Sequence, residues 1–164
     1  MDEAPVFPRG KGRKRRLGQW REYNPPRKPA MPPFEEIDHT ADWAFRVRAS
    51  SREGLFTEAA EAVYTLGGVQ AGPVAEESKT IRLQADDAEG LLILWLNELL
   101  FLLEHDHLAL KDIRVERMSD TSLEAAGRAV EVLAVGKYIK AATYSGLRIE
   151  EADGEWRATV VVDV

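Results

Sequence analysis

The sequence contains no cysteine, which excludes disulfide bonds, zinc–thiolate centres and thiol nucleophiles. Histidine is scarce as well, and the three histidines form no HExxH or Ser-His-Asp arrangement. His105 and His107 flank Asp106 after a long apolar segment, and we interpret them as cap and loop residues. The phosphate-binding loops GxxxxGK[ST] and GxGxxG are also missing. Carboxylates are therefore the remaining candidates for chemistry.

Long apolar runs are absent too. The most apolar stretch, residues 91–103, includes Asn97 and Glu98. It is also shorter than the roughly 20 residues that a membrane-spanning helix needs. The basic N-terminus is not followed by an apolar segment, so we expect no signal peptide. We predict a protein without a membrane span, with the cytoplasm as its default compartment.

Charge is divided unevenly along the chain. Residues 1–33 carry nine Lys/Arg, three Asp/Glu and seven prolines, and their apolar residues follow no period. This composition predicts a disordered, basic, proline-rich extension. It is either an arm that binds RNA or a partner, or a solvated tail without a specific role. Residues 34–164 carry 13 basic and 25 acidic groups, a net charge of −12. Because such a body repels nucleic acid, we expect any direct RNA contact to come from the tail.

The ordered part is expected to begin with a strand and a helix. Residues 42–49 alternate between apolar and polar side chains, which is typical of a half-buried strand. Ser50 and Glu53 match a capping box, with Ser50 as the N-cap of the helix. Glycines 67–68 are suited to end that helix, and residues 72–73, Gly-Pro, are interpreted as part of a linker.

A second strand is predicted over residues 78–85, followed by a helix capped by Asp86. This helix is apolar on nearly every side, so we expect it to be the central buried helix. Its polar exceptions, Asn97 and Glu98, should form a narrow exposed or hydrogen-bonded strip.

The remaining sequence predicts strands over residues 108–117, 121–135, 147–150 and 155–164, with a hairpin turn at 152–154. The expected class is α+β, with two helices packed against antiparallel β-sheets in a single domain, residues 34–164.

Two acidic residues stand out on polar strand faces. Asp42 begins the first strand on the face opposite Trp43, and Asp163 lies near the end of a valine-rich strand. Two carboxylates and the terminal oxygens of Val164 are the type of ligand that a hard cation requires. The alternative is that each aspartate is an independent surface acid, and the spacing alone does not decide between these two interpretations.

Four motifs, in order, resemble the archease family. They are the segment FEEIDHTADWAFRVRASSREGLFTEAAEAVYTL with HTAD at 39–42, then LLILWLNELLFLLE, KAATYSGLRIE and the terminal VVVDV. Together they cover roughly residues 34–164. The sequence departs from the pattern at Ser145, where many members have histidine, and the basic extension is not part of the common domain.

The resemblance implies an accessory protein rather than an enzyme. Archeases act with the RtcB-type tRNA-splicing RNA ligase, promoting its guanylylation by GTP and its multiple turnover. The metal-binding acids of the family fall on Asp42 and Asp163, with the final carbonyl on Val164, and the functional lysine falls on Lys140. Ca²⁺ is the preferred ion, with Mg²⁺ and Mn²⁺ as alternatives. RNA would be contacted indirectly or through the tail.

Two other functions stay open. A chaperone-like module would bind RNA-processing enzymes without a chemical role. A hydrolase would use Asp42 and Asp163 as an acid–base pair, but the sequence identifies no nucleophile for it.

Overall fold

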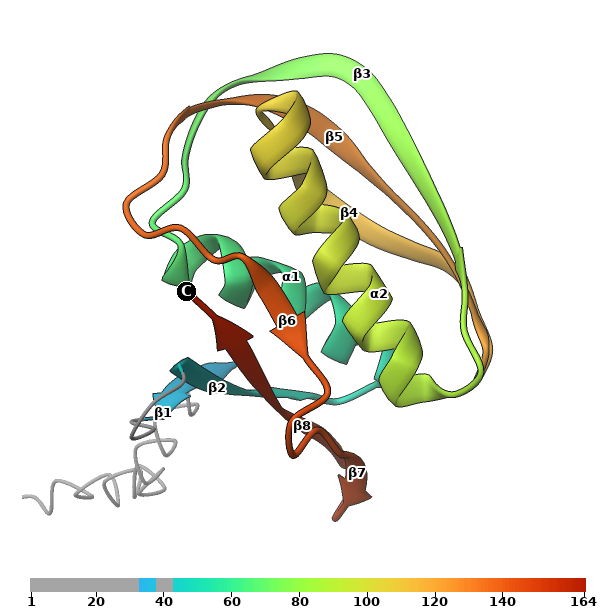
Figure 1. The fold of residues 1–164 in the computed structure, drawn as a ribbon. Coiled ribbons are helices and arrows are strands. Elements are labelled where there is room, and N and C mark those ends of the chain that lie inside the picture. Colours follow the sequence, from blue (N-terminus) through green and yellow to red (C-terminus); the bar gives the residue numbers. More distant parts are fainter. Residues whose placement is uncertain (1–32, 38–42) are drawn as a thin grey trace, which may run out of the picture. The chain divides into compact units, whose positions relative to one another are not determined.

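The computed structural model describes residues 33–37 and 43–164, with only the backbone of residues 74–76. This part of the chain forms two antiparallel sheets and two helices, which confirms the predicted α+β class (Figure 1). The tail interpretation falls on residues 1–33, of which 1–32 lie outside the described residues. In the described part, no helix is long and apolar enough to cross a membrane.

The larger sheet is built around the C-terminal strand. Its order is β1-β2-β8-β6, with β7 also paired to β8, and every pairing is antiparallel. The strands are β1 Phe34–Ile37, β2 Trp43–Ala49, β6 Ala141–Thr143, β7 Ile149–Ala152 and β8 Glu155–Asp163. Phe45, Val47, Ala158 and Val160 are buried on one face, which therefore faces the core. Because the last strand, β8, pairs with β2, it brings the two ends of the described domain side by side.

The smaller sheet has the order β3-β5-β4. Its strands are β3 Gln70–Gln84, β4 Leu108–Met118 and β5 Ser122–Ala134. Strand β3 begins eight residues before the predicted start, so the supposed linker at Gly72 and Pro73 belongs to the strand. Register shifts before Ser78 explain the error, because the irregular pairing interrupts the alternation that identifies a strand.

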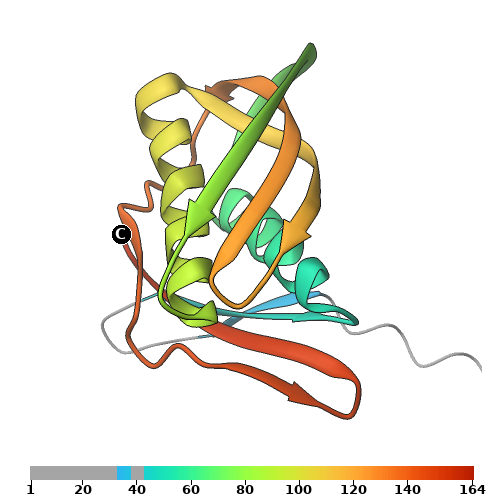
Figure 2. The same cartoon turned by 90° about the vertical axis from the view of Figure 1, so that its right-hand side faces the viewer.

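Two helices lie against both sheets. Helix α1, Arg52–Leu66, contacts β2 and β8 of the larger sheet and β4 of the smaller one. Helix α2, Ala88–Phe101, contacts α1, β6 and β3 and continues into a π-helical turn, η1, Leu102–Asp106. Figure 2 shows α1 between the two sheets. His107 ends the turn in the left-handed conformation with φ 54°, which confirms its interpretation as a cap.

Both helices start one residue later than the sequence predicted. The N-caps are Ser51 and Asp87 rather than Ser50 and Asp86. Each cap accepts a hydrogen bond from a glycine three residues later, Ser51 Oγ from Gly54 N at 3.0 Å and Asp87 Oδ1 from Gly90 N at 2.7 Å. A Cβ added to either glycine would lie 3.0 Å from that cap oxygen. The signal in both cases is therefore S/D-x-x-G, not a capping box.

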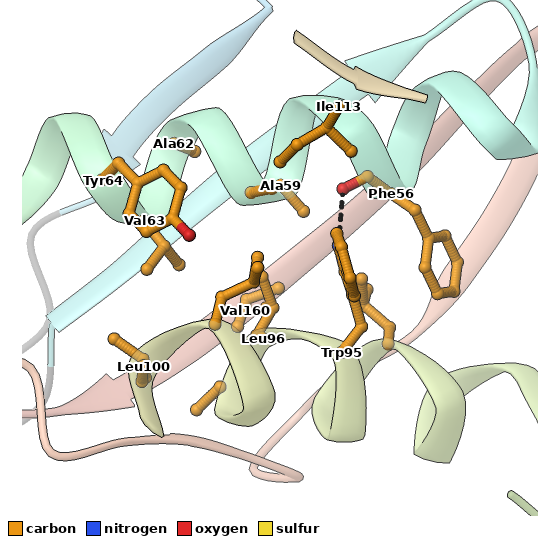
Figure 3. Packing of buried hydrophobic residues seen from close by; sticks show 14 of the residues in the cluster. Phe56, Ala59, Ala62, Val63, Tyr64, Trp95, Leu96, Leu100, Ile113 and Val160 are labelled. Atoms are coloured by element: carbon orange, nitrogen blue, oxygen red, sulfur yellow. Dashed lines mark hydrogen bonds between the residues drawn. The ribbon is translucent and has the colours of Figure 1, made fainter. Parts of the chain in front are cut away.

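The core lies where α2 faces α1 (Figure 3). Trp95 is fully buried, and its indole Nε1 donates to the carbonyl oxygen of Phe56 at 3.0 Å. Tyr64 directs its hydroxyl into the same core, where it accepts from Leu110 N at 3.2 Å, and burial raises its pKa. The prediction of a central buried helix is confirmed, because Trp95 and Leu99 are both 0% exposed.

Candidate functional site

Strand β6 is held in place from both sides. On one side it pairs with β8, with Ala142 opposite Val162. On the other side Asn97 of α2 makes two bonds to Ala142, donating from Nδ2 to the carbonyl at 3.1 Å and accepting from the N–H at 2.8 Å. The side-chain amide therefore replaces a neighbouring strand. This confirms the hydrogen-bonded alternative for Asn97 and fixes the strand that follows Lys140 directly.

The loop before β6 is anchored to the end of α1. The backbone N–H groups of Gly136 and Lys137 both donate to the Gly67 carbonyl at 3.0 Å. Gly68, with φ +59°, lies so close that a Cβ on it would come within 3.3 Å of the Gly136 Cα. Ile139 is 5% exposed and attaches the loop to the core. Lys140 follows directly and is exposed.

Three of the four predicted site residues lie together where β8 ends beside β6 (Figure 1). The Lys140 backbone N–H donates to the Asp163 carbonyl at 2.8 Å. The Lys140 ammonium Nζ donates to the main-chain oxygen of Val164 at 2.9 Å. Asp163 and Val164 are both exposed, so the carboxylate, the terminal oxygen and the ammonium are accessible to a partner.

The fourth predicted residue, Asp42, lies outside the described residues. Its neighbour in the chain, Trp43, is opposite Val162, which is the neighbour of Asp163. The Lys137 Nζ lies 3.6 Å from the centre of the Trp43 ring, a cation–π contact. Two lysines therefore border this corner of the sheet.

Within residues 33–37 and 43–164, no group of three or more His, Cys, Asp or Glu side chains could hold a metal ion. The corner supplies one carboxylate, on Asp163, and one main-chain oxygen, on Val164. Both are hard oxygen ligands, which fit Ca²⁺, Mg²⁺ or Mn²⁺ rather than a thiophilic metal. The shared site of Asp42 and Asp163 stays a prediction.

Aromatic and aliphatic side chains are exposed along α2 and beside β6. Leu94 is 40% exposed and Phe101 is 52% exposed, seven residues apart on α2 and so on one side of the helix. Tyr138 is 47% and Tyr144 63% exposed. A hydrogen bond to the Glu104 carboxylate is the main cause that raises the pKa of Tyr138. Leu94 and Phe101, on one side of α2, are therefore candidates for contact with another protein.

Sequence reasoning did not identify the partner of Asn97. It also did not identify the cluster of arginines on the face of the larger sheet that points away from the core. The alternation in β2 and β8 did place Arg46, Arg48 and Arg157 on polar faces. That β2 and β8 are neighbours could not be read from it, because they lie at opposite ends of the chain.

Comparisons with known proteins agree with the fold. The sequence model of the archease protein family (MTH1598/TM1083) matches residues 34–164. The chain is 36% identical over 137 residues to "Protein archease" of Archaeoglobus fulgidus, covering 80% of this chain and 98% of that one.

Two solved structures share the architecture. Protein 1598 of Methanobacterium thermoautotrophicum is 26% identical, with a TM-score of 0.60 over 82% of this chain and all of that chain. An archease of Thermotoga maritima, described as a possible chaperone, is 23% identical with a TM-score of 0.59, over 79% of this chain and 96% of that chain.

Proposed function

Because the chain belongs to the archease family, we propose that it is a metal-binding activator of an RtcB-type RNA ligase, promoting guanylylation and multiple turnover. The proposal is supported most directly by the meeting of Lys140, Asp163 and Val164 at one exposed corner. In this proposal the protein is not itself an enzyme, and it acts in the cytoplasm.

The metal would be held by the carboxylates of Asp42 and Asp163 together with the main-chain oxygen of Val164. Asp42 precedes Trp43 in the chain, and Trp43 lies opposite Val162, the residue before Asp163. Ca²⁺ takes six to eight oxygen ligands, so three from this chain leave positions for water, a phosphate or a ligase side chain. When bound, such an ion would supply neutralisation of phosphate charge during nucleotidyl transfer.

Lys140 has a different part in the proposal. An ammonium has three donors and no acceptor, so it cannot be a metal ligand. It can orient the C-terminal main-chain oxygen, as its 2.9 Å bond to Val164 shows, and offer its other donors to an anionic group of the ligase or its nucleotide. We therefore expect Lys140 and the aspartates to fail in different ways when they are replaced.

The test combines calorimetry with a guanylylation assay. Binding of Ca²⁺, Mg²⁺ and Mn²⁺ is measured beside GTP-dependent labelling of purified ligase. Asp42→Asn and Asp163→Asn should abolish both metal binding and stimulation, whereas Lys140→Met should abolish stimulation without any loss of metal affinity. The matched control is Asp153→Asn, in the hairpin at the other end of β8, about 30 Å away at the usual rise of a strand. It should behave as the unmodified protein does.

A chaperone-like module is the second candidate. It is favoured by the exposed apolar side chains of α2 and by the description of the Thermotoga maritima archease as a possible chaperone. If both aspartate variants still stimulate the ligase fully, the metal-dependent proposal fails and this candidate replaces it. Replacing Leu94 and Phe101 by Ser should then remove stimulation instead.

A further inference from the structure

Arginine side chains gather on the outer face of the larger sheet, away from the core. Within each strand they alternate with buried residues, as Arg46 and Arg48 do with Phe45 and Val47. A hollow of about 340 Å³ opens on this face. Its polar lining consists of Arg46, Arg48, Arg148, Glu150, Arg157 and Thr159. Four guanidinium groups and a single carboxylate therefore line the hollow.

The strand register places like charges opposite each other. Arg48 of β2 pairs with Arg157 of β8, and Arg46 pairs with Thr159. The Arg46 Nε donates to the Thr159 hydroxyl at 3.5 Å. Like charges directly opposite on neighbouring strands are destabilising. A bound anion between the two strands would convert this repulsion into attraction.

Acidic groups border the hollow and pair with two of its arginines. Glu35 lies 3.9 Å from Arg48, and Glu155 accepts from Arg157 Nε at 2.6 Å. Glu150 is paired in register with Arg157. The side chains of these two pairs are 19–57% exposed. Ion pairs that reach solvent contribute little free energy, so an anion with several oxygens can compete for the guanidinium donors. Arg148 is exposed on the rim.

The geometry points to a site for the phosphate groups of single-stranded nucleic acid, and we propose this function for the outer face of the larger sheet. Guanidinium groups match phosphate oxygens with two parallel donors. Arg46 and Arg48 are two residues apart, about 6.6 Å along the strand, so they offer successive contacts to an extended chain of phosphates. The lining has no aromatic side chain on which a base could stack, so contacts to phosphate without sequence preference are expected.

This site is separate from the proposed metal corner. Arg157 and Asp163 are six residues apart on β8, about 20 Å along the strand. The inference therefore does not depend on metal binding or on ligase activation. The inference differs from the expectation that direct RNA contact comes from the tail, because the net charge of −12 over residues 34–164 conceals a local cluster of positive charge.

The test uses the full chain, fluorescein-labelled single-stranded oligouridine RNA and anisotropy at several salt concentrations. The variant is Arg48→Gln with Arg157→Gln. The matched control is Arg114→Gln with Arg117→Gln, which removes the same charge from exposed positions on β4. We expect at least tenfold weaker binding for the first pair and less than twofold for the control. The slope of log K against log salt should fall by about 1.4, for two lost contacts to a single strand.

Two further arms complete the test. Arg48→Lys with Arg157→Lys keeps the positive charge but loses the two parallel donors of each guanidinium group. This variant should bind RNA with an affinity between those of the unmodified protein and the glutamine pair. Thermal melting of every variant checks that its fold is unchanged. If both glutamine pairs weaken RNA binding equally, the effect is one of general charge. If Arg48→Gln with Arg157→Gln leaves the RNA affinity unchanged, RNA binds elsewhere on the protein. Either result overturns the proposal. The last arm follows the arginine Nε–H signals by NMR while RNA, inorganic phosphate or pyrophosphate is titrated into the protein. If phosphate or pyrophosphate binds more tightly than RNA, the choice of a nucleic-acid strand as the ligand is overturned.

Discussion

Replacing Asn97 by alanine tests how strongly one amide holds β6 to the core. The change removes two hydrogen bonds, of 3.1 and 2.8 Å, and leaves the N–H and C=O of Ala142 without these partners. Ala142 is 4% exposed, so both groups lie in largely buried backbone. A buried polar group that loses its partner costs about 1–3 kcal/mol. Because water can enter the space left by the side chain, we expect a total loss of ~2–4 kcal/mol.

Thermal unfolding followed by circular dichroism measures this loss. For a chain of this size each kcal/mol lowers Tm by about 2–4 °C, so Asn97→Ala should lower it by roughly 4–16 °C. The control is Glu98→Ala, on the adjacent residue of the same helix, for which a change within ~0.5 kcal/mol is expected. If Asn97→Ala costs as little as this control, the two bonds do not stabilise the fold.

Asn97→Asp separates the two bonds. The aspartate oxygen can still accept from the Ala142 N–H, but a second oxygen then faces the Ala142 carbonyl in place of the amide donor. We expect a destabilisation at least as large as that of the alanine variant. Release of β6 should also speed hydrogen exchange at the Lys140 N–H, which donates to Asp163. Unchanged exchange at this amide would show that β6 keeps its place without Asn97.

Three further predictions concern stability. Leu99→Ala, at a fully buried position, should cost ~2–5 kcal/mol in chemical denaturation, and a loss below ~0.5 kcal/mol would contradict the central place of α2. Ser51→Ala should cost ~0.5–2 kcal/mol and Ser50→Ala close to nothing, because only Ser51 caps α1; equal losses would refute this N-cap assignment. Deleting residues 1–32 should leave Tm nearly unchanged, and a loss of several degrees would show that the segment packs on the domain.

The sequence predicted the elements that carry their own periodicity. Strands β2 and β8 and both helices were identified because each buries one regular face or, for α2, nearly every side. Strands β1 and β6 were missed. Ala141–Thr143 has three residues and no alternation to read, and its position depends on β8 and on Asn97, which are distant in sequence. Tertiary contacts define such a strand, so local pattern cannot reveal it.

The candidate site was predictable only in part for the same reason. Strand phase singled out Asp163, beside the terminal oxygens of Val164, and the family resemblance singled out Lys140. Their meeting depends on the pairing of β6 with β8 and on the glycine contacts that hold the loop to α1. The arginine hollow could not be predicted either, although its residues were recognisable one by one. Its residues were visible as polar positions, but cross-strand register alone shows that Arg48 lies opposite Arg157.

The contact between Lys140 and Val164 makes a final prediction about metal affinity. The ammonium Nζ lies 2.9 Å from the main-chain oxygen that the proposed cation would also use, so two positive charges would share one ligand atom. A unit charge and a divalent ion about 4 Å apart in water repel each other by about 2 kcal/mol. Lys140→Met removes that repulsion and should tighten Ca²⁺ binding about thirtyfold in calorimetry, although ligase stimulation is lost. If Ca²⁺ binding weakens tenfold instead, Lys140 orders the C-terminal oxygen for the metal, and its main role is to position that ligand rather than to contact the ligase.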